Sequence, residues 1–142
     1  MQIKSDFQIK HLEIIQTVIN RLAGNSFLIK GWAITISLAG FGLFTNKNNS
    51  IFLILVLFSA VIFWILDSYY LRQEKLFRNL YQSLVEQARN NGSELGSFTM
   101  NVSGSRKNVQ GLLCIMFSFP VVLIYLAIIG MAGLLFFRLK FI

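Results

Sequence analysis

The stretch at residues 111–137, GLLCIMFSFPVVLIYLAIIGMAGLLFF, decides the fold class because none of its 27 side chains is charged. An α-helix needs about 20 residues to cross a hydrocarbon core of about 30 Å, so this stretch predicts a transmembrane helix. The whole chain is 55% hydrophobic and 13% charged, whereas soluble domains carry roughly 25% charged residues. We therefore expect an integral membrane protein and not a soluble globular enzyme.

Two further apolar runs precede this stretch. Residues 51–66 (IFLILVLFSAVIFWIL) carry no charge, and the run ends at Asp67. Residues 31–46 (GWAITISLAGFGLFTN) form a shorter run, which reaches membrane width if it begins at Ser26 and the stem of Lys30 extends to the lipid head groups. The sequence therefore predicts three transmembrane helices.

These runs predict an all-α integral membrane protein in which two of the three transmembrane helices continue into a cytoplasmic helical hairpin. No turn residue interrupts the helix of the second run before residues 90–92, whereas residues 24–26 stand between the first run and its amphipathic stretch. The expected segments are a cytoplasmic amphipathic helix at 1–25, transmembrane helices at 26–46, 51–67 and 111–137, an outer turn at 47–50, a second cytoplasmic amphipathic helix at 68–90, a polar loop or short β element at 91–110, and an outer tail at 138–142.

The cationic side chains are distributed unevenly between the two sides of these spans. Ten of the 13 Lys and Arg residues lie in segments 1–30 and 67–110, and three lie at Lys47, Arg138 and Lys140. Cytoplasmic loops carry the excess of Lys and Arg in membrane proteins. The sequence therefore predicts that the N-terminus lies in the cytoplasm and that the C-terminus lies outside.

Each cytoplasmic helix carries an apolar stripe at three- and four-residue spacing. Gly24 lies at the end of the first helix, where it marks either a hinge or a weak point in a continuous helix. The stripe on the second helix is a candidate interface with another subunit or a partner, and the alternative is packing within one chain. Its members are Tyr70, Phe77, Leu80, Tyr81, Leu84 and Ala88.

The polar segment before the last span contains one alternating pattern. Phe98, Met100 and Val102 are apolar, and the residues between them are polar. Period-two alternation is typical of a β-strand, and a single strand needs a partner to be stable. Residues 97–103 therefore form either a short strand or a loop.

Sequence motifs for enzyme chemistry are missing. The chain has one Cys and one His, so it has no intrachain disulfide pair and no usual zinc ligand set. It also has no glycine-rich phosphate loop and no Ser/His/Asp order, and no His follows any Arg. We expect no enzymatic activity, no cofactor, no metal site and no catalytic residue.

Polar residues within the spans are the more informative candidates. Lys30 and Asp67 fall at the cytoplasmic ends of adjacent antiparallel spans, so they can pair at similar depth. Ionisable residues at membrane depth are candidate functional residues, and the alternative here is a pair of interfacial anchors. Thr35 and Ser37 either line a polar path or bond carbonyls of their own helix. These four residues are the candidate pore or gate residues.

Two blocks of sequence carry a resemblance to known proteins. Residues 25–32 (NSFLIKGW) and 63–78 (FWILDSYYLRQEKLFR) look like those of a family of small bacterial inner-membrane proteins. In size and plan the chain also resembles membrane pore and channel effectors of antiphage defence, such as the CRISPR accessory membrane pore and the Hailong-type channel subunit. The resemblance implies a homo-oligomer that permeabilises or depolarises the inner membrane when triggered. Neither block is a catalytic signature.

The leading functional hypothesis is a homo-oligomeric pore or ion-channel effector of antiphage defence, because three spans in one chain cannot enclose an aqueous path. The alternatives are a membrane anchor or scaffold whose cytoplasmic helices recruit a soluble defence partner, and a holin-like lysis protein. The expected partners are the lipid bilayer, further copies of the chain, and a soluble defence partner or a nucleotide- or oligonucleotide-type trigger. We expect no direct binding of duplex nucleic acid.

Overall fold

The computed structural model describes residues 2–47, 49–90, 100–107 and 109–140. Every regular element in this part of the chain is helical, which confirms the expected all-α fold. In chain order the elements are α1 (Gln2–Lys47), α2 (Ile51–Asn90), the short 3-10 helix η1 (Gly104–Lys107), α3 (Leu112–Met116) and α4 (Phe119–Lys140). Three of them, α1, α2 and α4, are long and apolar enough to span a membrane.

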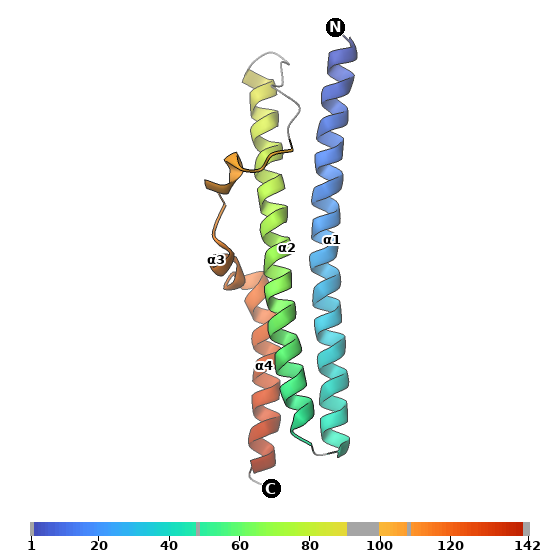
Figure 1. Ribbon diagram of the computed structural model, residues 1–142, viewed down its shortest axis with the longest axis vertical. Coiled ribbons are helices and arrows are strands. Elements are labelled where there is room, and N and C mark those ends of the chain that lie inside the picture. Colours follow the sequence, from blue (N-terminus) through green and yellow to red (C-terminus); the bar gives the residue numbers. More distant parts are fainter. Residues whose placement is uncertain (1, 48, 91–99, 108, 141–142) are drawn as a thin grey trace.

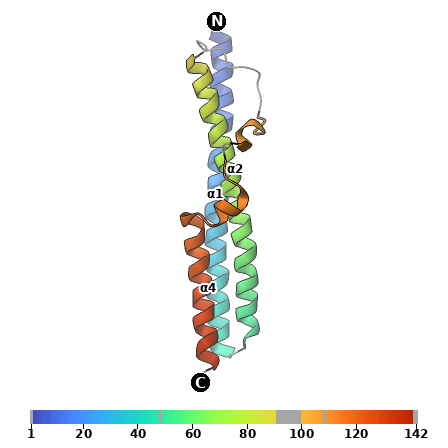
Figure 2. The same cartoon turned by 90° about the vertical axis from the view of Figure 1, so that its left-hand side faces the viewer.

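Helices α1 and α2 form a long antiparallel hairpin (Figure 1). They contain 46 and 40 residues, and at 1.5 Å per residue they are about 69 Å and 60 Å long. Both exceed the bilayer core of about 30 Å, so about 30–40 Å of each projects beyond it. Helix α4 lies beside the half of the hairpin that contains the α1–α2 turn, and both side views show it there (Figures 1 and 2).

The first helix continues through Gly24 without a hinge. A second glycine, Gly40, is required by the close approach of the two long helices. A Cβ atom at this position would lie 2.2 Å from Cγ2 of Val56, so any larger side chain would require Val56 or α2 to shift. The small residue therefore sets the spacing of the hairpin in its membrane-spanning half.

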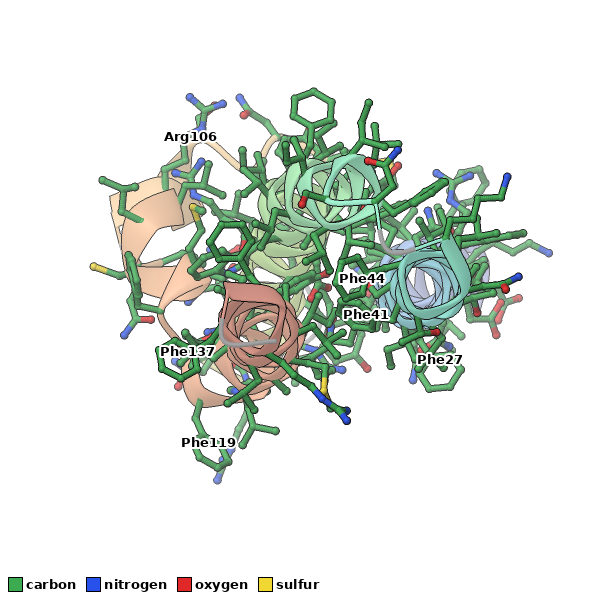
Figure 3. The ribbon with its side chains drawn as sticks, turned by 90° about the horizontal axis from the view of Figure 1, so that it is seen from below. Phe27, Phe41, Phe44, Arg106, Phe119 and Phe137 are labelled. Atoms are coloured by element: carbon green, nitrogen blue, oxygen red, sulfur yellow. The ribbon has the colours of Figure 1, made fainter. Side chains whose placement is uncertain are left out.

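The membrane-spanning half has an apolar core between its three helices. Small side chains from the hairpin meet larger ones from α4, with Tyr125 at its centre. Viewed along the bundle, Phe41 and Phe44 point between the helices, whereas Phe27 and Phe137 point outward (Figure 3). The fully or nearly buried members of this core are Ala33, Val56, Ala60, Val121, Tyr125 and Ile128.

The half of the hairpin away from the α1–α2 turn, here called the distal half, is held by a separate apolar layer between α1 and α2. Ile15 and Ile19 of α1 are buried against Leu80 and Leu84 of α2. Half-buried Phe77, Tyr81, Leu12 and Val102 surround these four residues. The helical periodicity of the two stripes therefore has a partner within the chain.

The apolar stretch 111–137 is divided by a bend at Phe117–Ser118 into α3 and α4. Pro120 explains the bend, because its nitrogen carries no hydrogen and cannot bond the carbonyl of Met116 as a regular helix requires. The indole nitrogen of Trp64 donates to that carbonyl instead, at 3.0 Å. Trp64 also stacks on Tyr125, with ring centroids 5.9 Å apart. One side chain of α2 thus fixes both the bend and the start of α4.

The part of the 97–103 segment that the structure describes, residues 100–103, forms no strand. The side chain of Asn101 accepts hydrogen bonds from the backbone nitrogen of Ser103, at 2.9 Å, and from its hydroxyl. This local turn competes with strand pairing, which is why the alternating pattern was misleading here. Residues 97–99 lie outside the described residues.

We predict that Trp64→Phe lowers the free energy of unfolding by about 1 kcal/mol, because Phe keeps an aromatic ring but leaves the Met116 carbonyl without its donor. Thermal unfolding of the purified protein in detergent measures the change. Trp32→Phe is the matched control, since Trp32 is 60% exposed. Equal effects of the two variants would contradict the assigned role of the indole hydrogen bond.

We predict that Leu84→Glu separates the distal halves of α1 and α2, because it places an unpaired charge where a 4% exposed side chain stands. The expected cost is about 3 kcal/mol or more. Limited proteolysis should cut the distal halves of the two helices faster while the membrane-spanning half stays protected. Gln82→Glu, at an exposed position on the same turn, should leave the cleavage rate unchanged; cleavage of both variants at one rate would refute the role of this layer.

Candidate functional site

Lys30 of α1 and Asp67 of α2 lie together between the two long helices. Lys30 is 17 residues from the end of α1 at Lys47, and Asp67 is 16 residues from the start of α2 at Ile51. Because the helices are antiparallel, both residues stand about 24–26 Å from the turn. Lys30 Nζ is 2.6 Å from Asp67 Oδ1, which confirms the expected pairing.

Ser26 completes this charge cluster, which we define as Ser26, Lys30 and Asp67. Its hydroxyl donates to Asp67 Oδ1 at 2.5 Å and accepts a hydrogen bond from Lys30 Nζ at 2.8 Å. Ser26 stands four residues before Lys30, so one face of α1 presents both side chains to the same carboxylate. Each of the three residues is therefore bonded to the other two.

The cluster is closed off from solvent on the side of Asp67. The side chain of Asp67 is 0% exposed and that of Lys30 is 20% exposed. Asp67 Oδ2 is buried and has no hydrogen-bond partner among the described residues, although the carboxylate is close enough to the Tyr125 phenol to interact with it. The Tyr125 hydroxyl itself donates to the Phe63 carbonyl at 3.1 Å. All three membrane-spanning helices thus enclose the carboxylate.

The position of the cluster along the two helices determines its depth in a bilayer. When the turn between α1 and α2 lies at the outer boundary of a hydrocarbon core of about 30 Å, the carboxylate of Asp67 lies about 6 Å inside the inner boundary. A charge there is costly unless it is paired, and ionisable groups at such positions mark ion pathways and switches. Removing one partner of a buried pair leaves the other uncompensated, which is strongly destabilising.

The two hydroxyl candidates occupy different surfaces of α1. Thr35 is exposed, and its hydroxyl donates to the Gly31 carbonyl at 2.9 Å. Ser37 is 2% exposed and donates to the Ala33 carbonyl at 2.7 Å. Both hydroxyls therefore bond their own helix, and only Ser37 shares the buried face with the charge cluster.

The candidate interface stripe on α2 is mostly covered by α1. Leu80 and Leu84 are buried in the apolar layer of the distal half, and Phe77 and Tyr81 pack at its edge. A partner could use these residues only if α1 moved away. Tyr70 and Ala88 are half-buried at the two ends of the stripe. Beside the stripe, Arg78 Nε lies 2.7 Å from Oε1 of Glu74, four residues before it on the same helix.

Sequence reasoning missed two residues that matter to this site. Ser26 could have been found, because a hydroxyl four residues from a lysine shares its helical face. Tyr125 had no signal, because its position against Asp67 depends on how α4 docks on the hairpin. No group of three or more His, Cys, Asp or Glu in the described part of the chain could hold a metal ion.

Comparisons with known proteins give no further guide. No protein-family model matches the chain, and no similar sequence was found among curated proteins and no similar fold among solved structures. The features that bear on function are therefore the three apolar helices, the buried charge cluster and the exposed surfaces of the helices.

Proposed function

We propose that this chain is the subunit of a homo-oligomeric pore or ion channel in the bacterial inner membrane. The buried pair of Lys30 and Asp67 is the observation that carries the proposal, because ionisable groups at membrane depth are expensive and are kept where they serve transport or switching. The three apolar helices supply the membrane localisation on which the proposal depends.

Exposed apolar surface supports assembly from several copies. Within the most apolar window of each of α1, α2 and α4, only 22%, 28% and 22% of the residues are buried inside the chain. The interior of the bundle is filled by the apolar core around Tyr125, which leaves no aqueous path through the described part of one chain. Conduction therefore requires copies arranged around an axis.

The charge cluster is suited to hold such a pore shut. Lys30 reaches the surface with 20% of its side chain, whereas Asp67 is fully enclosed. Separating them leaves an uncompensated carboxylate in a low-dielectric environment, so the closed arrangement is favoured until water or ions replace the ammonium. A trigger that moves α1 against α2 would break the pair and open the path. Ser37, on the same buried face of α1, is the next candidate to line this path, whereas Thr35, on the exposed face, would line only a path between copies.

A role in antiphage defence is the part of the proposal that comes from the resemblance in size and plan. In that role the chain is a toxic effector that depolarises the membrane when triggered. An anchor that recruits a soluble defence partner through its long cytoplasmic helices differs in its readout, because it forms a stable complex and leaves the membrane impermeable.

The proposed orientation predicts the result of reporter fusions. A reporter after Ile142 should be external and one inserted at Gly92 should be cytoplasmic, because ten of 13 Lys and Arg residues fall on the side of Gly92. Paired alkaline phosphatase and fluorescent protein fusions measure this, since each is active on one side only. A cytoplasmic C-terminus would contradict the orientation.

We predict that Asp67→Lys and Lys30→Asp each increase ion flux from liposomes that contain the purified chain, and that the double swap restores the tighter state. In the double variant the carboxylate at position 30 remains four residues from the Ser26 hydroxyl, so the hydrogen bond can form again. Lys10→Asp, at an exposed position on the cytoplasmic part of α1, is the control and should leave the flux unchanged.

Expression level and elution volume in detergent are measured beside the flux. Recovery of expression in the double swap, where the single variants fail to accumulate, would equally show that the two residues act on each other. Single variants with the flux and expression of the unaltered chain would refute the proposed gate, and so would a double swap no better than either single variant.

A further inference from the structure

An open groove lies on the cytoplasmic side of the charge cluster. One wall is α2, with Lys75, Arg78, Asn79 and Gln82, and the other is the segment at 109–110 that leads into α3. Its volume is about 300 Å³, which is at the lower end for small-molecule sites. The groove is separate from the charge cluster, which lies two turns of α2 nearer the membrane centre.

The lining of the groove favours an anion. Two of the lining side chains are cations and three are amides, and none is a carboxylate. Arg78 already bonds Glu74 through Nε, at 2.7 Å. Lys75 is half-buried and has no ion-pair partner among the described residues. The Lys75 ammonium therefore has three N–H donors that can bind a ligand.

A second hollow continues on the other side of Arg78. It has a volume of about 160 Å³, and α1 contributes Gln16 and Asn20 to it. Arg78 and Gln82 line both hollows, so one ligand can contact both helices of the cytoplasmic hairpin. Amide side chains both donate and accept hydrogen bonds, which suits the polar atoms that flank a phosphate.

The distance of the groove from the start of α2 places it at the membrane surface. Lys75 is 24 residues and Gln82 is 31 residues beyond Ile51, which is about 36 Å and 46 Å from the start of α2. With the start of α2 at the outer boundary, the groove begins in the inner head-group layer and opens into the cytoplasm. A lipid head group and a soluble phosphate compound can both reach it.

We propose that this groove binds a phosphate-bearing ligand, with Lys75 as the main contact and Arg78 and Gln82 as further donors. The ligand is the head group of an anionic phospholipid or a soluble phosphate compound. A ligand that extends past Arg78 and Gln82 into the second hollow also contacts Gln16 and Asn20 of α1. Binding is a property of the groove alone and can be measured whether or not the chain conducts ions.

The test uses the full chain in nanodiscs and the variant Lys75→Gln. Titration with pyrophosphate or ATP in zwitterionic nanodiscs examines the soluble source. Thermal stabilisation by phosphatidylglycerol over phosphatidylcholine examines the lipid source. In one of these two arms Lys75→Gln should weaken binding about tenfold, as expected for a lost charge-assisted hydrogen bond. Arg89→Gln removes the same charge from an exposed position outside the groove and should leave binding unchanged.

Each outcome decides the proposal. A loss in the pyrophosphate or ATP arm that is specific to Lys75→Gln identifies a soluble ligand, and a specific loss in the phosphatidylglycerol arm identifies a lipid. Equal losses in Lys75→Gln and Arg89→Gln mean attraction to overall positive charge, which overturns the proposal. Absence of binding in both arms overturns it as well. Neither result bears on whether the chain forms a pore, which the liposome flux measures separately.

Discussion

The ion pair between Lys30 and Asp67 is the interaction on which the membrane-spanning half depends. It joins α1 to α2 at 2.6 Å, and Ser26 bonds both partners. The pair is enclosed where an unpaired charge would be expensive, so α1 and α2 have one favoured register at this depth. Two further contacts hold the same register. Gly40 approaches Val56 on the side of the pair nearer the α1–α2 turn, and the apolar layer around Leu80 and Leu84 lies on the other side.

The two halves of the hairpin have different environments and different chemistry. In the membrane-spanning half α4 covers one side of the hairpin. Large apolar side chains, such as the outward-pointing Phe27 and Phe137, cover the rest of the surface (Figure 3). In the distal half α1 and α2 pack against each other through the layer around Leu80 and Leu84, and amides and cations line the groove beside α2. Motion of α1 against α2 would be felt in both halves, because each helix is continuous through the charge cluster.

Much of this architecture could be predicted from the sequence. The uncharged runs and the polar turn between them gave the long hairpin, and counting residues from that turn placed Lys30 opposite Asp67. Residues 111–137 were expected to form one helix, so the bend before Pro120 was not predicted, although a proline interrupts helical hydrogen bonding. The Trp64 indole, which donates to the carbonyl that Pro120 cannot bond, depends on the docking of α4. Tyr125 reaches Asp67 for the same reason, and neither contact has a local pattern. At Asn101 a side-chain turn prevailed over an alternating pattern, since it satisfies the backbone without a neighbouring strand.

Single-channel recording of the purified Asp67→Asn variant in planar bilayers tests the central claim most directly. Asn has nearly the shape of Asp but removes the charge that holds Lys30, so the apolar core around Tyr125 should remain intact. The account predicts discrete current steps, with a larger fraction of time in the open state than for the unaltered chain. A silent bilayer that contains correctly inserted variant protein would contradict the claim that the buried pair keeps a pore closed.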